Sequence, residues 1–364
     1  MKLKEIVSFF EQTASFSFQE SYDNSGLQTG NPGADVSGAL ITLDVTEEVV
    51  DEAVREGLNL IISHHPVIFG QLKGLTGKNA TERILLKAIK GDIAILSVHT
   101  NIDSVEHGVN GRICDKLGLV DRKVLAPAEG KLLKLVFFVP ADHASRVREA
   151  IFHAGAGVIG DYDQCSFNVD GTGTFRASEN ASPYVGEKGQ LHFEKEVRVE
   201  TVLPSHIKNR VIAALLDNHP YEEVAWDLYT LENSWPQVGM GMTGRFEEAM
   251  EEHDFLNAVK AVFNAGCVRY TRLTGKTVQH VAVCGGSGSF LLENAISAGA
   301  DAFITADFKY HQFFEADGRI LVADIGHYES EQFTKELFYE LVTKNFPKFA
   351  VRLSEVITNP INYI

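Results

Sequence analysis

The stretch LNLIISHHP at residues 58–66 is a short apolar segment that ends in two adjacent histidines. Two later segments have the same construction, IAIL at 93–96 and ILVA at 320–323. The side chains that follow the three segments include His64, His65, His99, Asp103, His327 and Glu331. Short buried strands that carry polar residues at their carboxyl ends mark the functional edge of an open α/β sheet. Because these residues are imidazoles and carboxylates, the pattern predicts a site for a divalent metal such as zinc, manganese or iron.

Strand and helix patterns alternate in the first and the last third of the chain. The strands are expected at 38–44, 58–62, 93–96, 278–284, 301–307 and 318–324, and the helices between them at 46–55, 81–90, 290–297 and 310–316. This order predicts parallel sheets with helical crossovers. The phrases AVREGLNLIIS and AISAGADAFIT both place a helix end and a glycine before a strand, which favours two similar α/β lobes that face each other. The general likeness of all βαβ units is the alternative explanation.

The segment between these lobes has a different pattern. Its elements follow the order β-α-β-β-α-β, with strands at 132–140, 165–178, 193–203 and 222–231 and helices that begin near Asp142 and Ser205. That order is typical of an inserted α+β module of the ferredoxin-like type. Linkers are expected at Ala126–Lys131 and Glu232–Gly241, which are rich in Gly, Pro and polar residues. We therefore predict a first α/β lobe at 1–125, a ferredoxin-like insert at 126–240 and a second α/β lobe at 241–364.

Composition excludes several classes of protein. The 364 residues suffice for two or three domains, and a hydrophobic fraction of 45% allows a large core. A formal net charge of −16 argues against nonspecific binding to nucleic acid or to an anionic membrane, although it leaves room for a local basic pocket. No apolar stretch approaches the roughly 18 residues of a membrane span, and MKLKEIVSFFEQ reads as a helix face, not as a signal peptide. The four scattered cysteines predict reduced thiols in a cytoplasmic protein.

Each candidate ligand also has an ordinary explanation. Adjacent residues in an extended chain point in opposite directions, so His64 and His65 cannot easily chelate one metal, but at a strand end they can each hold one of two metals. His327 and Glu331 share a helix face at spacing i, i+4, and Asp103 can bridge two metals through its two oxygens. The alternatives are satisfied surface or core histidines, an acidic cluster that complements a helix dipole, and a turn or cap aspartate.

Together, three nitrogens and two carboxylates are sufficient for two metals with coordination positions left for water. A water between two such ions would have a lowered pKa and could act as a nucleophile. His99 and Asn101 lie beside the same rim as outer hydrogen-bond partners, as a general acid or in a structural role. Asp307, Lys309 and His311 follow the corresponding strand of the second lobe, which makes them candidates for substrate contact or proton transfer. The glycine-rich CGGSGS at 284–289 lacks the lysine of a P-loop, so it is either a phosphate cradle or a plain tight turn.

These motifs resemble the NIF-three-like family, whose bacterial members are labelled GTP cyclohydrolase 1 type 2 homologues. The matching phrases are YDNSGLQTG at 22–30, SHHP at 63–66, HTNID at 99–103, CGGSGS at 284–289, TADFKYH at 305–311 and GHYESE at 326–331. The match covers both outer lobes, and the insert with NHPYEEVAWDLY at 218–229 resembles the PII- or CutA-like insert of longer members. Ala306 and Tyr22 depart from the glycine and tryptophan common in the family, and neither is a ligand.

The resemblance implies a dinuclear metal centre held by His64, His65, Asp103, His327 and Glu331, with zinc as the expected metal and manganese, iron or cobalt as alternatives. It also implies a toroidal homohexamer whose metals face an internal cavity. The expected function is metal-dependent hydrolysis of a nucleotide-like or other phosphorylated small molecule. A noncatalytic scaffold, regulator or metal-handling protein is the alternative, because ferredoxin-like inserts often serve in oligomer contacts or ligand sensing. DNA binding through the hole of a toroid is a third hypothesis, which the net charge disfavours.

Overall fold

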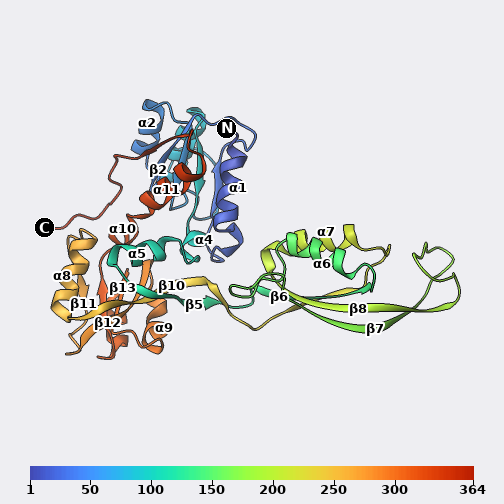
Figure 1. Ribbon diagram of the computed structural model, residues 1–364. Coiled ribbons are helices and arrows are strands. Elements are labelled where there is room, and N and C mark those ends of the chain that lie inside the picture. Colours follow the sequence, from blue (N-terminus) through green and yellow to red (C-terminus); the bar gives the residue numbers. More distant parts are fainter. The chain divides into compact units, whose positions relative to one another are not determined.

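The computed structural model describes all residues, 1–364, and has the α/β class that the sequence predicts (Figure 1). Its contacts separate the chain into two compact units. One unit combines Met1–Pro127 with Pro236–Ile364, and the other is Ala128–Trp235. All six polar residues that follow the three apolar segments therefore belong to one unit, and the middle unit contributes none of them.

The first sheet of the larger unit is five-stranded and contains the strand that ends at the histidine pair. Its order is β1 (Gly26–Thr29), β4 (Ala94–Ser97), β3 (Leu60–Ser63), β2 (Gly38–Thr42) and β15 (Ala350–Leu353). The last four are parallel, whereas β1 pairs antiparallel with β4. Every residue of β2, β3 and β4 is buried, which explains why these strands read as continuous apolar runs.

The second sheet is six-stranded. Its order is β11 (Arg269–Tyr270), β14 (Leu321–Asp324), β13 (Ala302–Ala306), β12 (Thr277–Ser287), β10 (Trp235–Glu251) and β5 (Val120–Ala128). β12, β13 and β14 are parallel, as predicted, and β10 and β11 run antiparallel to their neighbours β12 and β14. The carboxyl ends of the parallel strands in both sheets therefore carry the predicted site residues.

Helices connect the strands. They are α1 (Leu3–Thr13), α2 (Glu47–Arg55), α3 (Ala80–Lys90), α4 (Thr100–Asp103), α5 (Val109–Leu117), α8 (Glu252–Val262), α9 (Leu292–Ser297), α10 (His327–Glu331) and α11 (Thr334–Asn345), with 3-10 turns η1 (Phe16–Phe18), η3 (Ser289–Leu291) and η4 (Tyr310–Ala316). The predicted helix at 46–55 is confirmed, and Thr46 caps it by accepting a hydrogen bond from the Val49 amide. Gly91 ends α3 as expected. The expected helix at 310–316 is a 3-10 helix.

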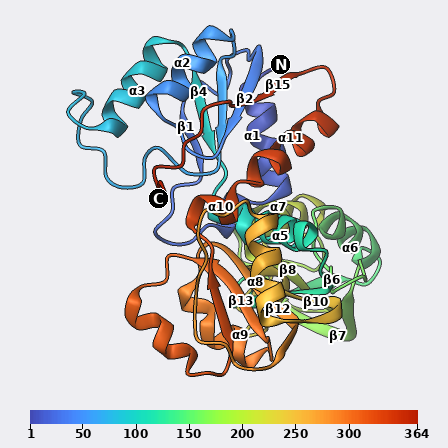
Figure 2. The same ribbon diagram turned by 90° about the vertical axis from the view of Figure 1, so that its left-hand side faces the viewer.

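The two sheets exchange elements, which holds them together. Helix α5 follows the strands of the first sheet but contacts β12 of the second, and α11 follows the second sheet but contacts β2 of the first. The strand after α11 is β15, which extends the first sheet (Figure 2). One continuous apolar cluster includes Ile41 and Leu60 from the first sheet and Val281 and Ala323 from the second. Because each sheet is completed by chain from the other half, the halves share one core.

The middle unit has its own core. Its elements are β6 (Leu132–Pro140), α6 (Ala144–His153), β7 (Ser166–Arg176), β8 (Leu191–Pro204), the 3-10 turn η2 (Ser205–Ile207), α7 (Lys208–Asn218) and β9 (Trp226–Thr230). The sheet order is β7-β8-β6-β9, and all neighbours are antiparallel. Apolar side chains on one sheet face, such as Leu135 and Val199, pack in a cluster with Ile151 of α6 and Leu215 of α7.

One expectation about the boundary of this unit is wrong. The stretches expected as linkers are largely strand, because β5 continues to Ala128 and β10 begins at Trp235. The glycines that suggested a linker instead allow the two strands to approach closely: a Cβ on Gly239 would lie 2.1 Å from the carbonyl oxygen of Ala126. Helix α6 begins at Ala144, near Asp142 as expected, and its N-terminal cap position is occupied by His143 without a side-chain hydrogen bond.

We predict that the middle unit can be removed without loss of the larger fold. Gly239 lies against Ala126 and Gly244 lies against Val120, so β5 and β10 run antiparallel and their ends can be joined by a two-residue turn. A chain that lacks 129–234 should unfold in one cooperative transition. Its circular dichroism should show the helix content that the larger unit has in the full chain. The matched control lacks 126–240, which removes paired strand residues and should melt several degrees lower. Equal melting temperatures of the two shortened chains would contradict this description of the boundary.

Candidate metal centre

The predicted ligands meet at a cavity of about 550 Å³ between the carboxyl ends of the two sheets. His65 and Asp103 reach the cavity from the first sheet and from α4, whereas His327 and Glu331 reach it from α10. Helix α10 lies where the two sheets meet (Figure 2). His64, directly after β3, is completely buried beside them. Residues more than 200 positions apart in the sequence therefore share one site.

The Glu331 carboxylate is the centre of this arrangement. Its Oε2 lies 3.0 Å from Nε2 of His65 and 3.1 Å from Nε2 of His327. Its Oε1 lies 3.6 Å from Nε2 of His64, which in turn lies 3.7 Å from Oδ1 of Asp103. Three groups of side chains could each hold a metal ion. His65–His327–Glu331 and His64–Asp103–Glu331 share Glu331, and the third group is His64–His65–His99.

Two buried polar atoms in this centre have no hydrogen-bond partner, Nε2 of His64 and Oδ1 of Asp103. Leaving such groups unsatisfied is costly in a folded protein. The Nδ1 of His64 donates a hydrogen bond to the Val98 carbonyl oxygen at 2.9 Å, so in the neutral ring the lone pair is on Nε2. A divalent cation would satisfy both atoms, and this mixture of nitrogen and oxygen donors suits zinc, manganese or iron.

Outer hydrogen bonds orient the imidazoles that surround the cavity. In each of three rings Nδ1 bonds a carboxylate at 2.7 Å, and the pairs are His65–Asp44, His327–Asp307 and His99–Asp23. Partners of this kind direct the remaining ring nitrogen toward the site. Sequence reasoning missed Asp44 and Asp23 as partners. Asp44 could have been noticed as an aspartate at the end of an apolar strand, and Asp23 as part of the polar loop YDNSGL. Neither pattern indicates which histidine the carboxylate contacts.

Charges in the centre are strongly coupled. Burial, and then the nearby charge of Glu331, raise the pKa of Asp103 to about 8. Burial disfavours ionised Glu331, but the charges of His327 and His64 outweigh it and hold its pKa well below the usual range. For His65, burial is outweighed by hydrogen bonds to Asp44 and Glu331, and its pKa rises to about 9. The pKa of His327 rises to about 11, because Glu331 and Asp307 outweigh burial. Near neutral pH, Asp103, His65 and His327 therefore carry protons, whereas Glu331 is ionised.

The predicted catalytic residues fall into two classes. Asp307 contacts the centre through His327 and also accepts a hydrogen bond from Ser287. Lys309 and His311 are exposed and do not line the cavity, and the His311 ring packs beside Tyr310 with ring centroids 5.1 Å apart. Their catalytic role stays a prediction.

The glycine-rich segment at 284–289 leaves space for the Glu331 side chain. A Cβ on Gly286 would lie 2.3 Å from Oε1 of Glu331, and Gly286 has a φ of 63°. The amide of Gly285 donates to Asn110 and that of Gly286 donates to the Ser330 hydroxyl. These two amides are therefore not free to cradle a phosphate.

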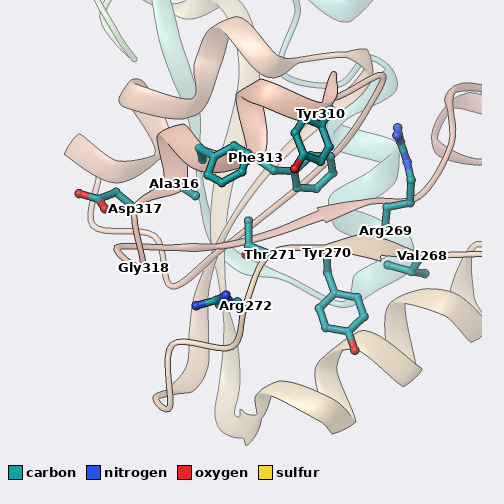
Figure 3. A pocket seen from close by; sticks show the side chains of 11 residues that line it. Val268, Arg269, Tyr270, Thr271, Arg272, Tyr310, Phe313, Ala316, Asp317 and Gly318 are labelled. Atoms are coloured by element: carbon teal, nitrogen blue, oxygen red, sulfur yellow. The ribbon is translucent and has the colours of Figure 1, made fainter.

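A larger cavity, about 790 Å³, lies elsewhere in the same unit between β11 and η4. Figure 3 shows its lining, which includes Arg269, Tyr270, Arg272, Tyr310 and Phe313. It contains none of the predicted ligands, and none of the three groups of metal-binding side chains lies there. The smaller cavity therefore remains the candidate site because it is where the buried ligand atoms converge.

Comparison with known proteins agrees with the motifs. The family model Duf34/NIF3 (NGG1p interacting factor 3) matches residues 1–360. This chain belongs to the Duf34/NIF3 family. A relative from Halalkalibacterium halodurans, named GTP cyclohydrolase 1 type 2 homolog, is 39% identical over 99% of this chain and 98% of its own length. The resemblance inferred from the sequence is thus confirmed.

Solved structures of Duf34/NIF3-type proteins share the fold. The Bacillus cereus protein related to NIF3 has 38% sequence identity and a TM-score of 0.85, and the alignment covers 100% of this chain and 99% of that chain. A Staphylococcus aureus protein has 28% identity and a TM-score of 0.79 over the same shares. None of the helices of this chain combines the length and apolar character that a membrane crossing requires.

We predict that substitutions will separate the two metal groups. Asp103→Asn should leave about one bound ion per chain. Glu331→Gln should lower the metal content most, because it removes a ligand from both groups that contain a carboxylate and leaves only His64–His65–His99 intact. Asp44→Asn should weaken affinity roughly 10–100-fold through His65 without removing a ligand. Elemental analysis and metal titration of purified protein measure these effects. Glu329→Gln, a buried carboxylate of the same helix outside both groups, is the control and should retain full metal content.

We also predict that metal binding releases protons. The pKa of Asp103 is raised to about 8 and that of His65 to about 9, so both groups carry protons at pH 7 that a metal must displace. Affinity should therefore rise between pH 6 and 9, by up to about tenfold per pH unit for each displaced proton. Calorimetric titration in buffers of different ionisation enthalpy counts the protons. Affinity that is flat or falls across this range would contradict the described charge coupling.

Proposed function

We propose that this protein is a dinuclear metal-dependent hydrolase that acts on a nucleotide-like or other phosphorylated small molecule. The observation that carries the proposal is the Glu331 carboxylate shared by two ligand groups, beside the buried and unpaired donor atoms of His64 and Asp103. When bound, two adjacent ions, zinc by preference, would supply Lewis acidity and an activated water. A cavity of about 550 Å³ is of the size that takes a small molecule.

The side chains around the cavity have separable proposed roles. Asp44 and Asp307 hold His65 and His327 with Nε2 toward the site. His99, held by Asp23, faces the same cavity and is available for contact with substrate. Lys309 and His311 stay candidates for substrate contact if substrate extends beyond the cavity toward η4. The curated relatives carry the name GTP cyclohydrolase 1 type 2 homolog, which supports a purine ring-opening hydrolysis as one version of the reaction.

A noncatalytic scaffold or regulatory protein is the second candidate. The middle unit favours it, because this unit has its own core and the β-α-β-β-α-β order of a ferredoxin-like module while contributing no ligand. In this proposal the chain assembles as a cytoplasmic homohexamer, and the metals stabilise its larger unit.

An activity screen separates the two candidates. Protein loaded with zinc, manganese, iron or cobalt should hydrolyse at least one nucleotide or phosphoester, and Asp103→Ala should reduce turnover by at least about 10²-fold while circular dichroism is retained. Glu329→Gln should retain turnover. Absence of turnover with every metal, together with partner binding that survives removal of all five ligands, would favour the scaffold instead.

A further inference from the structure

The middle unit contains a cavity that is independent of the metal centre. It has a volume of about 710 Å³ and lies on the sheet face opposite α6 and α7, between β7, β8 and the segments around Ala181–Tyr184 and Tyr221–Ala225. Cavities of this size are typical of small-molecule sites, and this one is lined by aromatic, polar and charged residues. No residue of the cavity belongs to the proposed hydrolase site.

Two glycines create the hollow. In β7 the side chains of alternate residues share a sheet face, and Gly171 and Gly173 occupy successive positions on the open face. Gly171 pairs with Glu196 of β8. A Cβ on Gly173 would lie 2.0 Å from Oε2 of Glu196, so the carboxylate rests over this glycine. A Cβ on Gly171 would meet nothing nearer than the Glu196 carbonyl oxygen at 3.9 Å, so the space above Gly171 is open.

Aromatic rings form the walls. Tyr221 lies at the centre of the group, with its ring centroid 6.1 Å from that of Phe175 and 6.2 Å from that of Tyr184. Phe138, from β6, also lines the cavity. Several aromatic rings around one space are the arrangement that attracts an organic cation through its contact with the ring faces.

The charge inside the cavity is negative. Oε1 of Glu196 accepts a hydrogen bond from the Tyr221 hydroxyl at 2.9 Å, and no Lys, Arg or His pairs with this carboxylate. Arg198, on the same face, is paired with Glu200 at 2.9 Å. Arg176 also lines the cavity, as do the acidic residues Asp170, Glu222 and Glu223, so acidic residues outnumber basic ones in the lining. Among these carboxylates, Glu196 lies over Gly173 and bonds the Tyr221 hydroxyl, so it is the one placed next to the aromatic rings.

We propose that this cavity binds a small organic cation, an ammonium group with apolar substituents, between the aromatic rings and the Glu196 carboxylate. The charge of Glu196 attracts the ammonium, and Tyr221, Phe175 and Tyr184 surround its substituents. The glycines of β7 provide the room. Such a site would make the middle unit a sensor for an amine metabolite, separate from the metal centre.

Calorimetric titration of the full chain with two probes tests the proposal. Choline carries a trimethylammonium group, and 3,3-dimethylbutan-1-ol has the same shape without the charge. We expect saturable binding of choline and at least about tenfold weaker binding of the alcohol. Equal binding of the two probes, or no saturable binding of choline up to about 10 mM, would overturn the proposal.

Matched variants locate the binding. Gly171→Leu fills the open space without a backbone clash and should abolish choline binding with an unchanged melting temperature. Glu196→Gln keeps an acceptor for Tyr221 but removes the charge, and should weaken choline binding at least about tenfold while leaving the alcohol unaffected. Glu187→Gln, a carboxylate outside the cavity lining, should bind choline as the unaltered chain does. Full choline binding by Glu196→Gln would overturn the assignment even if Gly171→Leu failed to fold.

Discussion

The contacts of the buried Glu331 carboxylate with three imidazoles are the interaction around which the larger unit is arranged. The carboxylate is buried, it is ionised, and it lies within reach of three imidazoles that come from two different sheets. A buried carboxylate is costly unless it is paired, and here its partners are His64 and His65, which directly follow β3, and His327, which begins α10. The glycines at 285 and 286 leave the space that the Glu331 side chain occupies.

The exchange of α5 and α11 between the halves explains how such a centre can be held rigidly. Helix α5 packs against β12 of the second sheet, and α11 packs against β2 of the first sheet. One apolar cluster contains residues of both sheets. The edge between the sheets is therefore enclosed by packed core and is not a hinge between separate domains. The candidate metal ligands at that edge keep fixed positions, because the strands that carry them cannot move apart without exposing apolar surface.

The two units contain cavities of different chemical character. The larger unit collects imidazoles and carboxylates at strand ends, where outer carboxylates fix the orientation of the rings. The middle unit has its own core on one face of its sheet, and on the other face lies a cavity lined by aromatic rings and by acidic residues that include Glu196. A catalytic centre in one unit and a ligand site in the other would allow substrate chemistry and metabolite sensing to coexist in one chain.

The sequence by itself determined the α/β class, the parallel strands, the family and the identity of the side chains that converge on the centre. These follow from local patterns: apolar runs of strand length, helix caps such as Thr46, and polar residues directly after strands. Only the tertiary structure decided that α5 and α11 are exchanged, that Asp44 and Asp23 orient histidines, and that the expected linkers are strands. Those features depend on contacts between residues far apart in the chain, such as Gly239 with Ala126, and no local pattern specifies which distant partner a residue will meet.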